Sequence, residues 1–159
     1  MRFLLRALAG TVMLALALCL LAPWLAYEIT LARLERLPER PAQLASPAQQ
    51  AAIWQRAGGE GPLAVEPVNP YGFMLALVAR ERVRPGEELA SWVARDHLRQ
   101  LPPTGMLAWQ LRNAALTVWL TRHWSAAELA TAAGAVAGRS AAGPEPGGQR
   151  LLVGTHPRG

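Results

Sequence analysis

The chain has 159 residues, of which 52% are hydrophobic and 17% are charged, and its formal net charge is +5. Once a membrane segment is subtracted, this length allows one modest core, which excludes a second folded domain. All basic residues are arginines that alternate with glutamates instead of forming an uninterrupted block, so nucleic acid is not an expected partner. The positive charge suits an anionic membrane surface or an anionic wall polymer.

A hydrophobic segment near the N-terminus predicts a membrane-spanning helix. Residues 7–27 carry no charged side chain, and a helix of that length matches the roughly 30 Å hydrocarbon core of a bilayer. Arg2 and Arg6 precede the segment, while Trp24 and Tyr27 lie at its far end, where amphipathic rings favour the interface. This arrangement predicts an N-terminus inside the cell and a C-terminal domain outside the cytoplasm.

The same segment could be a cleaved signal peptide, but an uncleaved anchor is favoured. The apolar run is longer than usual for a signal peptide, and residues 23–27 contain no Ala-x-Ala exit. Cys19 follows Leu18, where a lipoprotein needs a small residue, and a lone cysteine allows no disulfide within one chain. We therefore expect a single-pass protein of the bacterial inner membrane with residues 1–30 as the anchor.

A linker is expected at residues 31–45, with the helix of the anchor continuing through Leu37 until Pro38 and Pro41 stop it. Helix signals then recur up to residue 138, so residues 46–138 should form a small extracytoplasmic domain. The fold class is all-α, with one transmembrane helix and about five short helices, which we expect near residues 46–57, 69–82, 87–101, 105–123 and 125–138.

Two helix starts carry strong local signals. Ser46 and Gln49 flank Pro47 as a cap with proline at the first helical position, and Ser125 with Glu128 forms a second capping box. Gly58 is the expected left-handed terminator of the helix that starts at Ser46. A turn at residues 85–86 should precede the helix that begins with Glu87 and Glu88.

The segment 105–123 is the most apolar outside the anchor. Its polar residues fall at three- and four-residue intervals, which predicts one polar stripe with the other sides buried: Gln110, Asn113, Thr117 and Thr121. A central core helix is favoured over a second span. Residues 139–159 are rich in Gly, Pro and Ser, apart from the short apolar patch 151–153, so we expect a disordered tail.

No phosphate-binding loop, zinc-protease motif or paired Cys and His at metal spacing occurs, so neither a metal site nor a cofactor is predicted. The remaining chemical resource is carboxylates, because glycosyl transfer and hydrolysis need two acids with different pKa values. Glu87, Glu88 and Glu128 are explained as residues of helix starts. Glu81 is the least well explained and is the candidate catalytic residue.

A resemblance to a known family rests on two stretches of sequence. The run LRNAALTVWLTRHWSAAEL at residues 111–129, together with ALVARE at residues 76–81, resembles the peptidoglycan glycosyltransferase domain of penicillin-binding proteins and monofunctional transglycosylases. The resemblance implies a catalytic role for Glu81. Arg82 stands where the family has Asp, and the family's Gly-Gly-Ser-Thr-Ile-Thr-Gln-Gln motif does not occur, so the chain would be a shortened relative.

The same resemblance suggests binding residues. Gln110, Arg112 and Asn113 are similar to the family's glutamine-lysine-asparagine motif, and this implies contact with peptidoglycan or its lipid-linked precursor. Membrane lipid is the other expected partner, because the anchor is embedded in it.

Three functions follow as hypotheses. The first is a non-catalytic module that binds wall glycan, lipid-linked precursor or another envelope protein. The second is an enzyme that polymerises or cleaves glycan strands, with Glu81 as acid or base. The third is a structural subunit of an envelope complex, because four tryptophans offer more aromatic surface than a small core is expected to hide: Trp92, Trp109, Trp119 and Trp124.

Overall fold

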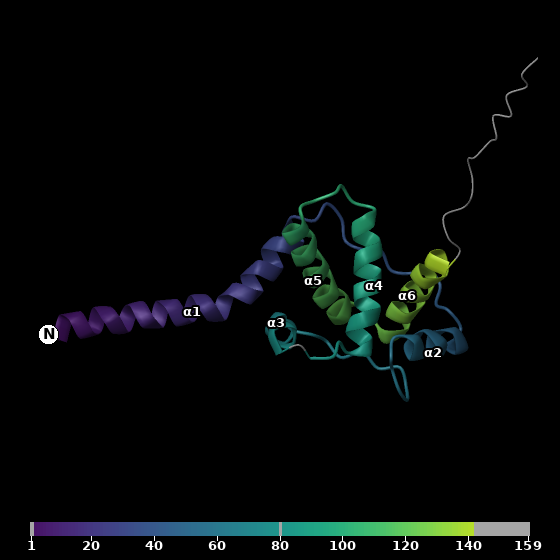
Figure 1. The fold of residues 1–159 in the computed structure, drawn as a ribbon, viewed down its shortest axis with the longest axis horizontal. Coiled ribbons are helices and arrows are strands. Elements are labelled where there is room, and N and C mark those ends of the chain that lie inside the picture. The colour runs from purple at the N-terminus through teal and green to yellow at the C-terminus, as the bar shows by residue number, and fades with distance from the viewer. Residues whose placement is uncertain (1, 80, 142–159) are drawn as a thin grey trace, which may run out of the picture.

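The computed structural model describes residues 2–79 and 81–141 of the chain, and within these residues it is all-helical. A long helix projects from a domain that is formed by five shorter helices (Figure 1). The helices are α1 (Arg2–Ala32), α2 (Pro47–Arg56), α3 (Pro70–Ala79), α4 (Pro85–Arg99), α5 (Met106–His123) and α6 (Ala126–Ala141). The predicted all-α fold with one N-terminal helix long and apolar enough to span a membrane is thus confirmed.

The two ends of α1 have different surroundings. Apolar side chains between Val12 and Leu21 are half or more exposed, whereas Tyr27 is only 7% exposed because this part of the helix packs on α5 and α3. Pro23 lies within the helix, and α1 changes direction as it approaches the domain (Figure 1). Proline removes a helical hydrogen bond and bends a helix, so it suits the place where the free part of α1 meets the docked part.

The expected continuation of the first helix through Leu37 is wrong, because α1 ends at Ala32. The amides of Arg33 and Leu34 donate to carbonyls only three residues earlier, which tightens the last turn. Leu34 then packs against the domain core. Burial of this leucine on the core competes with straight continuation of the helix, so the chain turns back over the domain.

Residues 33–46, which follow α1 and include most of the linker expected at residues 31–45, are hydrogen-bonded to the domain at several points. The carbonyl oxygen of Arg36 lies 3.0 Å from Nε2 of His97. Arg40 donates to the carbonyl oxygen of His123 at 2.7 Å, and the amide of Ala45 donates to Oγ1 of Thr131 at 3.0 Å. This segment is therefore a strap held against the domain surface.

The core lies where α4 packs on α5 and α6, with α2 closing one side. Its fully buried leucines come from three helices: Leu89 of α4, Leu116 and Leu120 of α5, and Leu129 of α6. A side chain added at Gly134 of α6 would meet Ile53 of α2 at 3.2 Å. The lack of a side chain at this glycine lets α2 lie close to α6.

Both predicted capping boxes are present. Ser46 Oγ accepts from the amide of Gln49, and Ser125 Oγ accepts from the amide of Glu128 at 3.2 Å while the Glu128 carboxylate accepts from the Ser125 amide at 2.7 Å. Gly58 has φ +84° after α2, as the sequence predicted.

Other predicted boundaries are also wrong. Pro85 and Gly86, expected as a turn, are the first residues of α4, because proline needs no amide partner in a first helical turn. Helix α6 continues past residue 138 to Ala141, since Arg139 is held by an ion pair with Asp96 at 2.7 Å. The start of the expected tail at residue 139 therefore belongs to the helix, while residues 142–159, including 151–153, lie outside the described residues.

The polar stripe of α5 is only partly as predicted. Gln110 is exposed, but Thr117 and Thr121 are buried, and Met106, Leu107 and Leu111 are exposed instead. Thr117 donates to the carbonyl oxygen of Asn113, and Thr121 donates to that of Val118. A threonine that satisfies its hydroxyl in this way is free to face the core.

The four tryptophans do not form an exposed aromatic surface. Trp124 is buried, and Trp92, Trp109 and Trp119 are partly buried against the core. The exposed aromatic surface expected from these residues is therefore absent among the described residues, because they pack on the main core, and Trp119 packs also on the cluster that contains Tyr27 and Val68.

Candidate functional site

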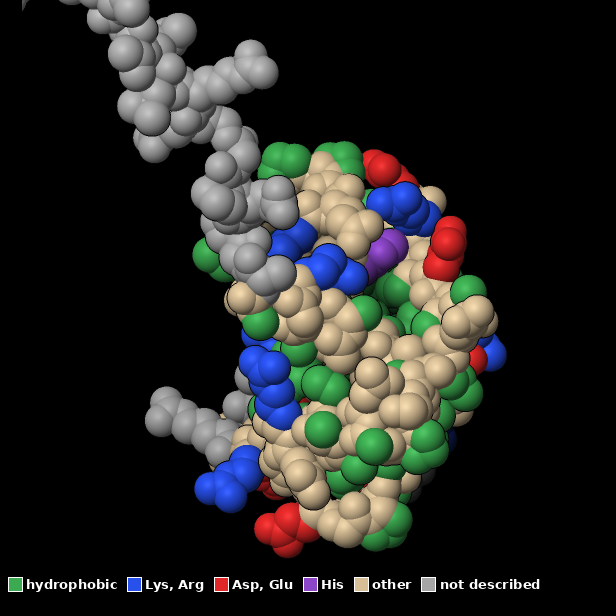
Figure 2. Space-filling view, turned by 90° about the vertical axis from the view of Figure 1, so that its right-hand side faces the viewer, with side chains coloured by type: hydrophobic (Ala, Val, Ile, Leu, Met, Phe, Trp, Pro, Cys, Tyr) green, Lys and Arg blue, Asp and Glu red, His purple; other side chains and the backbone are tan. Residues whose placement is uncertain are grey.

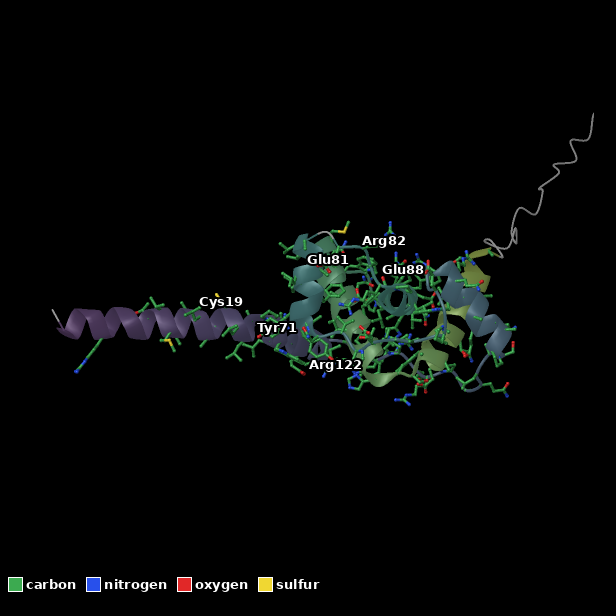
Figure 3. All side chains as sticks on the ribbon, turned by 90° about the horizontal axis from the view of Figure 1, so that it is seen from below. Cys19, Tyr71, Glu81, Arg82, Glu88 and Arg122 are labelled. Carbon is green, nitrogen blue, oxygen red and sulfur yellow. The ribbon has the colours of Figure 1, made fainter. Side chains whose placement is uncertain are left out.

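The residues that the sequence singled out lie on two different segments of the chain. Glu81 is exposed on the loop between α3 and α4, and Figure 3 shows it on the same side of the domain as Arg82 and Glu88. Gln110, Arg112 and Asn113 lie in the first half of α5. Gln110 is exposed, Arg112 is half-buried, and Oδ1 of Asn113 is buried without a hydrogen-bond partner. None of these four residues lines either of the two cavities described below.

One carboxylate that sequence reasoning explained as a helix-start residue has an unusual environment. Glu87 is only 8% exposed. Burial raises the pKa of its carboxyl group, while the guanidinium of Arg84, 3.6 Å away, and the Arg84 backbone amide act in the opposite direction. The charge of nearby Glu81 adds to the upward shift of the Glu87 pKa. Its position in a first helical turn gave no sign of burial, because burial there depends on how α4 packs against the preceding loop.

The neighbouring acid has a structural role. Glu88 Oε1 accepts from Nε1 of Trp92 at 2.6 Å and pairs with Arg95 at 3.3 Å. This carboxylate therefore holds two side chains of α4 in place, as a residue of a stable helix face does.

A cavity of about 350 Å³ lies between the strap, α4 and α6. We call it the polar cleft, and its charged and polar lining residues are Arg36, Glu39, Asp96, His97, Gln100 and Arg139. In Figure 2 the face that carries α2 and α6 is hollowed beside a histidine side chain, with arginines and acidic residues around the hollow. The cleft depends on the strap, because residues 36–39 and Pro41 form one of its walls.

Hydrogen bonds set the positions of the polar groups in this cleft. Oδ2 of Asp96 accepts from Arg139 at 2.7 Å and from Nε2 of Gln100 at 3.2 Å. The His97 ring is held by the Arg36 carbonyl oxygen. Trp124 also lines the cleft, and its indole Nε1 is buried without a hydrogen-bond partner among the described residues. An unpaired buried donor is uncommon and costly, and this one has almost no accessible surface of its own.

A second cavity, of about 260 Å³, lies where α1 meets α3 and α5. We call it the apolar groove, and its lining is almost entirely hydrocarbon, including Ala22, Pro23, Phe73, Met74, Leu111 and Val118. Such a surface favours a hydrocarbon chain and offers little to a sugar or a phosphate. Sequence reasoning missed both cavities, because each is built from helices that are distant in the chain.

Among the residues that the structure describes, no group of three or more His, Cys, Asp or Glu side chains is arranged to hold a metal ion. The polar groups present can therefore act through hydrogen bonds and charge, and the apolar groove through burial of hydrocarbon.

No protein-family model, no curated protein and no solved structure matches this chain.

Proposed function

We propose that the chain is a single-pass protein of the bacterial inner membrane, and that its helical domain, outside the cytoplasm, is a non-catalytic binding module for peptidoglycan or its lipid-linked precursor. The observation that carries the proposal is the polar cleft. It combines two carboxylates, two guanidinium groups, an imidazole and an amide around about 350 Å³, which suits a molecule rich in hydroxyl and amide groups.

The position of the cleft fits a ligand near the membrane. Helix α1 is long and apolar enough to cross a bilayer, and its outer end is docked on the domain, with Tyr27 and Leu31 packed against core residues. The strap that forms one wall of the cleft leads directly from this docked end. A ligand in the cleft would thus be held at a fixed distance from the anchor.

Binding can be tested with the full-length protein in lipid nanodiscs. Soluble wall-glycan fragments and lipid-linked precursor are titrated separately, and binding is measured by calorimetry. We expect Gln100→Ala and Arg139→Gln to weaken binding about tenfold, which corresponds to loss of one good polar contact. Gln110→Ala makes the same chemical change on α5, outside the cleft, and should leave binding unchanged.

The outcomes separate the two locations suggested for the ligand. Loss of binding in Gln110→Ala but not in Gln100→Ala would favour the residues singled out by the sequence and remove the cleft from the proposal. No binding of either ligand to the unaltered protein would contradict the proposed function as a whole.

A second candidate function is glycan-strand chemistry with Glu81 as acid or base. The observation in its favour is that exposed Glu81 lies close enough to buried Glu87 for its charge to raise the Glu87 pKa. Two carboxylates in different environments are what glycosyl transfer and hydrolysis need. Purified protein is incubated with lipid-linked precursor or with wall sacculi, and activity that disappears in Glu81→Gln but survives in Glu60→Gln, an exposed loop acid, would support this function.

A further inference from the structure

We propose that α3 is an interfacial helix, lying in the plane of the membrane surface with its exposed apolar side chains among the lipid chains of the outer leaflet. Because the depth of α3 is argued from α1 crossing the bilayer, this proposal rests on the membrane anchoring proposed above. The occupant of the exposed face of α3 is thus the lipid bilayer itself.

The first support is the composition and exposure of α3. Its sequence, PYGFMLALVA, contains no charged side chain. Met74, Leu75 and Val78 are exposed by 49%, 67% and 77%. Single exposed apolar residues are ordinary, but several together on one helix mark a surface that contacts another apolar phase. At about 25 cal/mol per Å² of apolar surface, removal of these side chains from water is favourable.

The second support is the depth of α3 relative to the span. In the apolar groove, Phe73 and Met74 of α3 share a cavity with Ala22, Pro23 and Ala26 of α1. These α1 residues belong to the uncharged run, whose first following charge is Glu28.

The length of the span places α3 at the same depth in the membrane. From Arg6 to Ala26 a helix rises about 30 Å, which is the thickness of the hydrocarbon core. With Arg6 at the inner boundary, Ala26 lies at the outer boundary. The α3 residues beside it therefore lie at the level where lipid chains meet headgroups.

The third support is the orientation of α3. In Figure 1 it is the part of the domain next to the free part of α1, and it is seen nearly end-on while α1 runs across the view. Figure 3, turned by 90°, shows α3 along its length and standing across the direction of α1. A helix that lies across a membrane span runs parallel to the membrane surface, as interfacial helices do.

The start of α5 also carries exposed apolar side chains. Met106 and Leu107 are exposed by 75% and 74%, and Leu111 of the same helix lines the apolar groove. The groove is thus bordered by exposed apolar side chains from α3 and by α5, and it is continuous with the side of α1. A lipid chain that fills it adds to the contact between the domain and the bilayer.

The experiment uses the full-length protein with Cys19→Ser. It is reconstituted in phosphatidylcholine vesicles of which roughly a quarter of the lipid is anionic phosphatidylglycerol. An environment-sensitive fluorophore is attached to Leu75→Cys or Val78→Cys, and to Gln55→Cys, an exposed control on α2. Quenching is measured with lipids that carry bromine on their chains. We expect a blue-shifted emission and strong quenching at positions 75 and 78, and neither at position 55.

Three other outcomes overturn the proposal, and they differ in what else they affect. If the protein resists carbonate extraction while the labels at positions 75 and 78 are as exposed to water as the label at position 55, α3 is not interfacial although the anchoring stands. If carbonate releases the protein, the anchoring itself fails. If positions 75 and 78 are shielded from water without bromine quenching, and nitroxides there couple between chains, a second copy covers α3.

A Leu75→Glu, Val78→Glu double variant should abolish the quenching of a label at Met74→Cys without altering the helical content.

Discussion

The guanidinium carbon of Arg122 lies 5.4 Å from the ring centroid of Trp24, which connects the last turn of α5 to the outer part of α1. Trp24 also packs edge-to-face with Tyr27 at 5.7 Å between ring centroids. Helix α1 and the domain are therefore joined by side chains as well as by the backbone.

Replacement of Arg122 by Gln is expected to weaken this joint. A cation over an aromatic face contributes about 0.5–1 kcal/mol at an exposed site, so we expect the free energy of unfolding to fall by about that amount. Thermal unfolding in nanodiscs, followed by circular dichroism, measures the change. Arg122→Lys keeps the charge and should retain much of the stability, and equal losses in both variants would contradict a role for the cation.

Replacement of Thr121 by Val is expected to destabilise the domain by about 1–3 kcal/mol, because it leaves a buried amide without its acceptor. Thr121 Oγ1 accepts from the amide of Val68 at 3.2 Å and is itself 3% exposed as a residue. Thr117→Val is the matched control, since the Thr117 hydroxyl only donates to the carbonyl of Asn113. Chemical unfolding of both variants should show the larger loss for Thr121→Val.

The two capping boxes should respond differently to acid. Hydrogen bonds from the Ser125 backbone amide and hydroxyl lower the pKa of Glu128 below its ordinary value of 4.5, with a smaller contribution from Arg40. A pKa that is lower in the folded state than in the unfolded state stabilises the fold at pH values above the unfolded-state pKa. This stabilisation is lost as the pH falls through the folded-state pKa. The box at Ser46 contains neutral Gln49 and has no such dependence.

We therefore expect Ser125→Ala and Ser46→Ala each to cost about 1 kcal/mol at pH 7. As the pH falls below 4.5, the cost of Ser125→Ala should shrink while that of Ser46→Ala stays constant. Unfolding curves recorded across this pH range test the difference. Parallel pH profiles for the two variants would show that the Glu128 charge does not matter to the cap.

Glu87→Gln is expected to raise stability at pH 7. Burial raises the Glu87 pKa, so the Glu87 carboxyl group binds its proton more tightly in the folded state than in the unfolded state. The stability of the fold therefore decreases as the pH rises through the folded-state pKa of Glu87. The neutral variant avoids this loss, and the two proteins should converge in stability at acid pH. Glu88→Gln should show no gain at pH 7, because Trp92 and Arg95 pair with the Glu88 carboxylate.

The helices and their caps could be predicted from sequence because their signals are local. Ser46 with Gln49 and Ser125 with Glu128 determine helix starts within four residues, and Gly58 provides a left-handed end that other residues rarely adopt. The apolar length of the first helix is equally local. These features need no knowledge of what packs against them.

The rest depends on contacts between distant parts of the chain. The end of α1 is set by the burial of Leu34 on the core, and the inward turn of Thr121 by the amide of Val68. Burial of Glu87 has the same origin, because a side chain at the preceding Gly86 would meet Val65 at 3.0 Å. A periodic pattern indicates which residues share a face, but not which side of a helix receives a strap or a loop.

The strap has a consequence for where the domain can act. A free linker of its length would let a tethered domain sample a hemisphere above the membrane, with a reach that grows with the square root of the linker length. Here Arg36, Arg40 and Ala45 are each hydrogen-bonded to the domain, so no slack remains between α1 and the domain. If α1 spans a bilayer as proposed, the domain diffuses in two dimensions with it, and a target must come within about one domain diameter of the lipid surface to be met.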